Sequence, residues 1–432
     1  GWNYSHNVFY YQDPGSKNVQ VYLGGALTTI FTTQDNGQTF SPPKGEYDEL
    51  FWDGEFLVYK TLDGTRYEFS NRLTSQLGIL DQIVDTNNNT TQFNYIYRND
   101  VPLLSQIMDA SGRLVNILYG DEGGGNWNNI VTIQEVVNNE HPRIVQYGYD
   151  NGGNLLSVTT NRYFEGVEEQ IVKTFTYDAA GMMATYTDPR GTVLYNEYDV
   201  DGRVVVQREH NPRIDAQGSS RLVWELSYGG GIAAAPGSVA CTTVTSHKNA
   251  QSSYQDITCF NADNHKTYHQ DGEGNEAFWT YNDAGMQASY TDANGFVTQY
   301  QYDDRRRLVR EIVPETNWYT QRDYEYEDIF NTPIRVTTYY RLANDVNAAR
   351  TTKQTTHTID NSTGNIISTT DSLGNQAFYQ YDAFGNRSQF MDKNGQITLY
   401  GYDALGNYVT QESVTVGQVD GSNQNSATQY AY

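Results

Sequence analysis

Short runs of β-branched and aromatic residues alternate with polar turn sequences along the chain. In the first 98 residues these runs include Val19–Leu23, Thr28–Thr33, Phe56–Thr61 and Thr65–Phe69. Sequences such as Asp-Pro-Gly, Asp-Asn-Gly and Asp-Gly separate them. β-branched and aromatic side chains suit a pleated strand, whereas Asp, Asn, Pro and Gly suit tight turns. The pattern therefore predicts an all-β chain whose strands follow one another through short turns.

The clearest pattern lies between residues 371 and 407, where one motif is written twice. DSLGNQAFYQYDAFGN begins at Asp371, and DKNGQITLYGYDALGN begins at Asp392, a spacing of 21 residues. Each period contains two turn signals, D-x-x-G and Y-D-x-x-G-N. Asp and Asn side chains bond nearby backbone groups, and Gly accepts the positive φ that tight turns require. One period therefore predicts one β-hairpin, and a series of such hairpins predicts a repeat architecture.

The same turn signals recur elsewhere in the chain. The turn residues that we expect to share this role are Asp178, Gly181, Asp188, Gly191, Asp199, Gly202, Asp292, Gly295, Asp382, Gly385, Asp403 and Gly406. Tyrosines two residues apart, such as Tyr379 and Tyr381, share one face of a strand. We expect such tyrosines to form aromatic ladders across neighbouring strands. A carbohydrate-binding platform is the alternative interpretation of the tyrosine stripe.

These motifs resemble the YD-repeat family, which is also called the RHS-repeat family. Gly1–Asn7 and Asp63–Phe69 are similar to the sequences that precede such repeat regions. The resemblance covers essentially all 432 residues. It implies tandem β-hairpins that form a continuous, curved sheet, which spirals to wall a hollow shell. Bacterial toxin cages, secreted polymorphic toxins and the teneurin barrel are members of this family.

The regularity of the repeats suggests how the chain is organised. We expect residues 1–98 to form leading strands and residues 99–432 to form the repeat array. The pattern loosens near 210–268 and 311–360, which we interpret as irregular inserts. The second insert contains a helix candidate at Leu342–Arg350. The chain begins inside the opening motif and stops where the next Tyr-Asp turn would begin, so we expect it to be a fragment of a longer polypeptide.

Composition and charge narrow the classes of partner. Hydrophobic residues make up 38% of the chain, and 36 tyrosines and 38 glycines are prominent. This composition favours a single sheet with solvent-exposed faces over a compact apolar core. The formal net charge of −24 argues against nucleic acids and anionic lipids. Solubility of a large surface explains such a charge, and an acidic inner wall that holds basic cargo is the alternative. No apolar run is long enough for a membrane-spanning helix.

Two cysteines, Cys241 and Cys259, flank a segment that reads as a hairpin. Similar distances from the hairpin tip would place them opposite one another, which makes a disulfide sterically reasonable. Two reduced, buried thiols are the second interpretation. A zinc site with His247, His265 and His269 is the third, but the usual paired C-x2-C spacing is missing.

Three further motifs have a simpler structural interpretation. Asp199-Val-Asp201-Gly202 resembles the start of a calcium loop but lacks the later ligands, so we read it as a repeat turn. Asp188-Pro-Arg-Gly191 matches the D-P-x-G type of signature that belongs to a self-cleaving protease in some members of the family. It lies in the middle of the array, however, and occupies an ordinary D-x-x-G turn. Asp303–Arg307 carries Arg306 where the repeat has glycine. It predicts a solvated turn with local ion pairs, or a docking point for an acidic cargo or partner.

No pattern in the sequence supports catalysis. Nucleophile and metalloprotease motifs are missing, and no single pair of carboxylates stands out as an acid and a base. We therefore expect a non-catalytic shell segment, without cofactor or metal, of a secreted or cell-surface protein. Its expected partners are an enclosed polypeptide or flanking domains of the same parent chain, and self-assembly or a receptor are further options. An extracellular adhesive or fibrous protein is the second hypothesis, and a glycan-processing enzyme is the third.

Overall fold

The computed structural model describes residues 7–24, 28–43, 46, 48–74, 76–121, 128–136, 143–164, 167–213, 215, 220–249, 252–316, 318–342, 351–403, 406, 408–419 and 422–430. Within these ranges all regular elements are β-strands, so the predicted all-β class is confirmed. Of the helix candidate Leu342–Arg350, only Leu342 lies inside the described residues, where it ends strand β27 (Pro333–Leu342).

The chain divides into two compact units. Unit 1 comprises Gly1–Trp2 and Val115–Val297, and unit 2 comprises Asn3–Leu114 and Thr298–Tyr432. The chain passes from unit 2 to unit 1 within β10 (Leu114–Tyr119) and returns to unit 2 at β24 (Val297–Tyr302). Unit 2 therefore contains both the leading strands and the last repeats.

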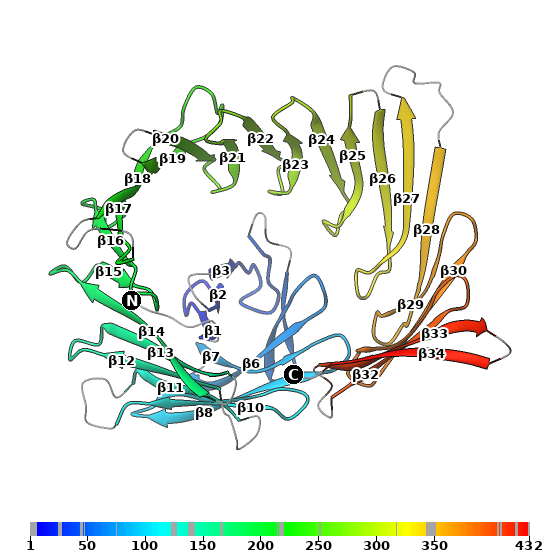
Figure 1. Cartoon of the computed structure of the whole chain (residues 1–432), viewed down its shortest axis with the longest axis horizontal. Coiled ribbons are helices and arrows are strands. Elements are labelled where there is room, and N and C mark those ends of the chain that lie inside the picture. The colour runs from blue at the N-terminus through cyan, green and yellow to red at the C-terminus, as the bar shows by residue number, and fades with distance from the viewer. Residues whose placement is uncertain are drawn as a thin grey trace. The chain divides into compact units, whose positions relative to one another are not determined.

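Unit 1 is an antiparallel run in which consecutive strands pair with one another (Figure 1). Its strands are β11 (Ile130–Val136), β12 (Arg143–Tyr149), β13 (Leu155–Phe164), β14 (Val167–Tyr177), β15 (Met183–Thr187), β16 (Val193–Tyr198), β17 (Val204–His210), β18 (Arg221–Gly230), β19 (Ala240–Asn249), β20 (Ser252–Phe260), β21 (Lys266–Gln270), β22 (Glu276–Tyr281) and β23 (Gln287–Thr291).

Unit 2 contains two groups of strands. The first group is β1 (Val8–Gln12), β2 (Val19–Leu23), β3 (Thr28–Phe31), β4 (Glu49–Asp53), β5 (Phe56–Lys60), β6 (Arg66–Thr74), β7 (Leu77–Val84), β8 (Thr90–Arg98) and β9 (Val101–Met108). The second group is β25 (Leu308–Pro314), β26 (Trp318–Tyr326), β27, β28 (Thr351–Ile359), β29 (Ile366–Thr370), β30 (Gln376–Tyr381), β31 (Arg387–Met391), β32 (Ile397–Tyr402), β33 (Val409–Val419) and β34 (Ser422–Gln429). Consecutive strands of the second group pair antiparallel, so each sequence period adds a hairpin.

The repeat strands are partly exposed on both faces. All residues of β15, β17, β23 and β25 are half-buried, although their side chains alternate between the two faces. The repeats therefore behave as a single layer, as the composition predicts.

The leading strands differ, because they contain a packed apolar core. Tyr10, Phe31, Leu57 and Phe69 are fully buried there. The Tyr10 and Phe69 rings pack edge to face, with their centroids 5.7 Å apart. Phe31 packs in the same way on Tyr59 of β5, with the centroids 5.9 Å apart. Strand β1 pairs with both β2 and β7, which brings β1–β3 together with β4–β7. The expectation of a coreless chain is wrong for these strands, because the low average apolar content hides their locally apolar sequences.

Candidate functional site

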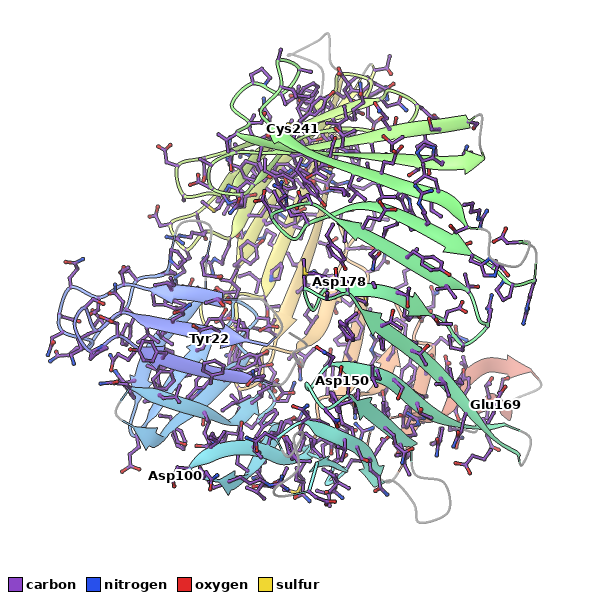
Figure 2. All side chains as sticks on the ribbon, turned by 90° about the vertical axis from the view of Figure 1, so that its left-hand side faces the viewer. Tyr22, Asp100, Asp150, Glu169, Asp178 and Cys241 are labelled. Carbon is purple, nitrogen blue, oxygen red and sulfur yellow. A yellow bond between two sulfur atoms is a disulfide. The ribbon has the colours of Figure 1, made fainter. Side chains whose placement is uncertain are left out.

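The typical repeat turn is organised by one carboxylate and one glycine. Gly181 donates its N–H to the Asp178 carbonyl at 3.1 Å. Asp178 Oδ1 accepts the N–H groups of Ala180 at 2.9 Å and Met182 at 2.8 Å. Gly181 has a φ of 80°, in the left-handed region that favours glycine. Figure 2 shows Asp178 and the equivalent Asp150 at the turns that follow their strands. The geometry is a type I turn followed by a glycine bulge.

The other turn residues singled out in the sequence have the same geometry, except that the turn of Asp403 closes one residue later, at Tyr408. The φ values are 84° for Gly191, 78° for Gly202, 81° for Gly295, 81° for Gly385 and 71° for Gly406. The carboxylates of Asp188, Asp199, Asp292 and Asp382 each accept backbone N–H groups two and four residues later, and Asp403 accepts that of Tyr408. Hydrogen bonds led by the Arg203 N–H lower the pKa of Asp199. These carboxylates hold the turns together.

Tyrosines that stand directly before a repeat turn, most of them in Tyr-Asp pairs, anchor the preceding strand. Tyr381 Oη donates to the carbonyl of Ile366, the first residue of β29, at 2.8 Å. The same bond joins Tyr177 to Leu155 (2.9 Å), Tyr198 to Met183 (2.8 Å), Tyr281 to Lys266 (2.7 Å), Tyr326 to Leu308 (2.8 Å) and Tyr402 to Arg387 (2.9 Å). Sequence reasoning missed this role, although the fixed position of tyrosine before aspartate was a signal for it.

Aromatic contacts between strands are also present. Tyr379 stacks on Phe390 with ring centroids 5.4 Å apart, and Trp279 lies 5.2 Å from Tyr290. These pairs lie directly opposite one another in the strand register. In these two repeats the aromatic residue two positions before the anchoring tyrosine contributes to a cross-strand ring pair, while the anchoring tyrosine contributes the hydrogen bond.

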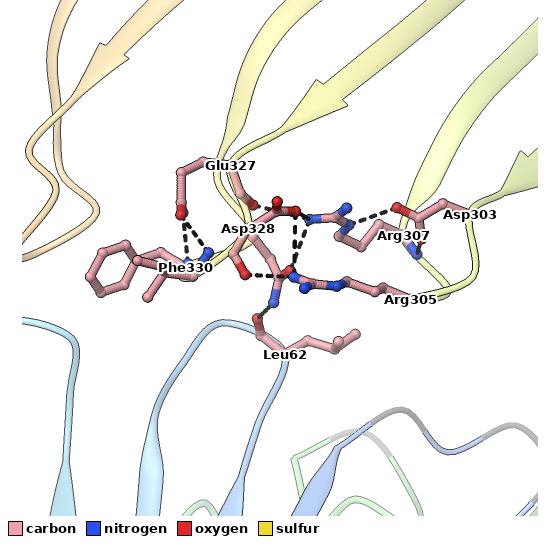
Figure 3. Close-up of polar contacts among 9 residues, drawn as sticks. Leu62, Asp303, Arg305, Arg307, Glu327, Asp328 and Phe330 are labelled. Carbon is pink, nitrogen blue, oxygen red and sulfur yellow. Dashed lines mark hydrogen bonds and ion pairs between the residues drawn. The ribbon is translucent and has the colours of Figure 1, made fainter.

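The Asp303–Arg307 turn is joined to neighbouring turns by its arginines (Figure 3). Arg307 Nε pairs with Asp303 Oδ2 at 2.8 Å, and Arg307 also donates to the Glu327 carbonyl at 3.0 Å. Arg305 donates to the Asp328 carbonyl at 2.6 Å. Hydrogen bonds and the charge of Arg307 lower the pKa of Asp303 against the effect of burial. The local ion pairs are therefore present, and we call residues 303–307 and 327–331 the arginine clasp.

The clasp also touches the leading strands of unit 2. Arg306 has a φ of 65°, a conformation that side chains other than glycine rarely adopt. Its guanidinium donates to the Glu46 carbonyl. Asn331 Nδ2 donates to the Leu62 carbonyl at 3.1 Å (Figure 3). Arg306, which stands where the repeat has glycine, thus joins two segments that lie about 260 residues apart in sequence.

A second group of turn contacts continues along unit 2. Asn365 Nδ2 donates to Asn87 Oδ1 at 2.7 Å. Asn89 Nδ2 donates to the Phe384 carbonyl at 2.7 Å. A Cβ atom added to Gly385 would lie 2.5 Å from the Asn87 side chain. The repeat turns of residues 360–386 therefore pack on the turn between β7 and β8.

Cys241 and Cys259 lie directly opposite one another on β19 and β20, and a disulfide joins them. Their Cα atoms are 4.0 Å apart. Both cysteines are buried with Ala235 and Tyr268. Gly229 lies opposite Cys241 on its other side. The 231–238 loop brings Ala235 onto this cluster, so the loop packs against the disulfide.

The histidines of the zinc hypothesis have other neighbours. His265 lies against the Tyr281 ring at 4.5 Å, His269 Nδ1 bonds the Thr258 hydroxyl at 3.1 Å, and His247 pairs with Glu225 at 2.8 Å. Among the described residues, no group of three His, Cys, Asp or Glu side chains is arranged to hold a metal ion.

A pocket of about 630 Å³ lies beside the arginine clasp within unit 2. Its lining includes Phe40, Glu49–Phe51 and Leu62 from the leading strands, and Asp304–Arg306 and Asp328–Ile329 from the clasp. Desolvation raises the pKa of Asp48, which also lines the pocket and accepts a hydrogen bond from Tyr59 Oη. The pocket combines an apolar lining with charges of both signs.

Comparison with known proteins identifies the repeat. The RHS Repeat family model matches residues 281–317, which include β24 and three repeat turns, and this confirms the predicted resemblance. The chain is similar to the Photorhabdus luminescens Tc holotoxin pore carrying a TccC3 mutation, with 12% identity and a TM-score of 0.38 over 98% of this chain and 26% of that chain. A TcdB2–TccC3 structure gives 11% identity and a TM-score of 0.36 over 98% and 27%.

A third solved structure, a porin-like protein from Bacteroides uniformis, gives 10% identity and a TM-score of 0.17 over 73% of this chain and 92% of that chain. No curated protein matches the chain. The chain spans about a quarter of the length of the Tc toxin chains that it matches. In the described part of the chain, no helix is long and apolar enough to cross a membrane.

Proposed function

We propose that this RHS-repeat chain is a non-catalytic wall segment of a shell that encloses a polypeptide cargo. The observation that supports the proposal is the partial exposure of both strand faces in repeat strands such as β15, β17 and β25. A sheet with two accessible faces provides an inner and an outer surface at once. A typical globular enzyme instead covers at least one face of its sheet with a second layer.

The turns and tyrosines explain how such a wall is stable with little core. The turn carboxylates satisfy backbone N–H groups in their own turns, and tyrosines such as Tyr381 satisfy a carbonyl of the previous strand. These bonds lie within a repeat or between neighbouring repeats. Stability is then a sum of local terms, as in other repeat proteins. A wall can therefore be extended without any need for a thick apolar interior.

The charge of the chain suggests the chemistry of the cargo. The formal net charge is −24, from 52 acidic and 28 basic residues. An acidic wall attracts a basic, incompletely folded polypeptide and disfavours nucleic acid. We place the parent protein outside the cell or at its surface, with the cargo supplied by flanking sequence of the same chain.

Protease protection in the complete encoded protein tests the proposal. We expect the polypeptide that follows the repeats to resist a broad-specificity protease while the repeats are intact. Mild denaturant that opens the repeats should expose it. Equal cleavage rates for the attached polypeptide and for the same polypeptide made alone would contradict enclosure. Binding of the intact protein to cells without any protected segment would favour the adhesive alternative.

A further inference from the structure

The disulfide of unit 1 lies in a row of residues that crosses four adjacent strands. Cys241 of β19 lies opposite Cys259 of β20. On the outer sides of the pair, Gly229 of β18 lies opposite Cys241, and Tyr268 of β21 lies opposite Cys259. Residues directly opposite one another place their side chains on the same face of a sheet. The disulfide therefore has a glycine on one side and an aromatic ring on the other.

The two sides of the disulfide differ in access. Gly229 is exposed, and a Cβ atom added to it would meet no atom within 4 Å. Tyr268 is 1% exposed, and Phe278 packs against the same cluster from the next strand. The exposed fractions of the cysteines follow this difference, with 6% for Cys241 and 0% for Cys259. A small reagent in solution therefore approaches from the Gly229 side and reaches Cys241 first.

The 231–238 loop is the element that responds to a change at the disulfide. Ala235 is buried with both cysteines, although the neighbouring Ala234 is exposed. Two unbonded sulfur atoms stay further apart than two bonded ones, at about 3.5–4.0 Å. A pair of thiols therefore needs more room than the disulfide in a site closed by Ala235 and Tyr268. Tyr268 belongs to a paired strand and donates to Glu276 Oε1 at 2.7 Å, so the loop is the part that yields.

We propose that Cys241 and Cys259 form a redox switch, at which a small-molecule thiol attacks Cys241 and the resulting reduction displaces the 231–238 loop. The attacking thiolate forms a mixed disulfide with Cys241 Sγ, the bond between the cysteines breaks, and Cys259 leaves as a thiolate that takes up a proton. A second thiol then attacks the mixed disulfide and leaves Cys241 as a thiol. The protein disulfide gains two electrons, and two small-molecule thiols become one disulfide.

Reduction of the full, folded chain by glutathione tests where the thiol attacks. The reaction is quenched by alkylation, and peptide mass spectrometry locates the mixed disulfide. We expect the rate to rise in proportion to the glutathione concentration and the mixed disulfide to lie on Cys241. A rate independent of glutathione would show that reduction waits for unfolding and would overturn the proposal. A mixed disulfide on Cys259, or a disulfide that glutathione leaves intact, would also overturn it.

Two neighbouring glycines of β18 provide matched variants. Neither Gly229 nor Gly230 has a positive φ, and valine suits a strand. Gly229→Val fills the approach to Cys241 and should slow the reduction at least about tenfold, with Gly229→Ala between this variant and the unaltered chain. Gly230→Val places its side chain on the other face and should leave the rate unchanged. Equal rates in the two valine variants would refute the approach from Gly229.

Hydrogen exchange tests the response of the loop. Reduction should speed the exchange of amides in residues 231–238 at least about fivefold, while the Asp178 turn of the same unit exchanges as before. Ala235→Gly removes the methyl group that contacts the disulfide, so loop exchange should lose its dependence on the redox state. Ala234→Gly, at the neighbouring exposed position, should retain it. Unchanged loop exchange on reduction, equal acceleration at the Asp178 turn, or the same redox response in both alanine variants would refute the switch.

This inference goes beyond the proposed function and does not rest on it, because it concerns one hairpin and its loop whether or not the chain encloses a cargo. Protease protection of the cargo without the redox response would retain the shell and refute the switch. The redox response without protease protection would retain the switch and refute the shell.

Discussion

Two glycines with the same backbone conformation allow the turn contacts of unit 2 to be measured. Gly385 and Gly395 both have a φ of 81° and both close an aspartate turn. An added Cβ at Gly395 meets no atom within 4 Å, whereas at Gly385 it would lie 2.5 Å from the Asn87 side chain. Alanine at the two positions therefore introduces the same backbone strain, but only one position disturbs the contact with the leading strands.

The expected magnitudes follow from these distances. Alanine in the left-handed conformation costs about 1–2 kcal/mol at either position. At Gly385 the methyl group must also displace Asn87, which accepts a hydrogen bond from Asn365 at 2.7 Å. Loss of that bond adds about 1 kcal/mol. We expect Gly385→Ala to be more destabilising than Gly395→Ala by about this amount.

Hydrogen exchange is the suitable assay, because a long repeat protein need not unfold in a single step. Gly385→Ala should speed the exchange of amides in the turn that contains Asn87 about fivefold, which is the effect of roughly 1 kcal/mol. Gly395→Ala should leave that turn unchanged and affect only its own hairpin. Equal exchange at the Asn87 turn in both variants would show that the repeat turns do not pack on the leading strands.

Three further outcomes are expected. Tyr381→Phe removes the hydroxyl that bonds the Ile366 carbonyl at the start of the preceding strand. Hydrogen exchange of the amides there should accelerate by the amount that a loss of about 1 kcal/mol in local stability produces. An unchanged exchange rate would contradict the anchoring role. Arg306→Gly relieves the positive φ but removes the guanidinium, so exchange near Glu46 should accelerate while the turn of Arg306 stays protected; slower exchange near Glu46 would contradict the contact. Burial raises the pKa of Tyr10 from 10.0 to about 12. Its neutral form stabilises the fold fully below pH 10, and this contribution is lost as the pH rises to about 12. Alkaline unfolding in this window should weaken in Tyr10→Phe but persist in the control Tyr11→Phe, and an equal response of both would refute burial as its cause.

The repeat could be predicted from the sequence because its turns depend on local chemistry. Asp178 and Gly181 form their turn through bonds that span no more than four residues. Such bonds are readable from spacing alone. The cross-strand position of Cys241 and Cys259 follows from hairpin symmetry in the same way.

Contacts between distant segments could not be predicted in this way. The bond from Arg306 to Glu46 joins residues about 260 positions apart, and no local pattern indicates the partner. The sequence shows only that Arg306 replaces glycine. The buried core around Tyr10 and Phe69 was missed for a second reason besides the low average apolar content, because its residues come from strands that pair out of sequence order, β1 with β7.

The two types of stabilisation in unit 2 have different consequences for opening. A repeat hairpin is held by turn carboxylates and tyrosine hydroxyls, and these bonds can break one hairpin at a time. The leading strands share a buried core, so they must open together. Contacts such as those of Arg306 and Asn87 connect the two parts. We therefore expect loss of these contacts to precede unfolding of the leading core, which would free the last repeats while β1–β7 remain folded.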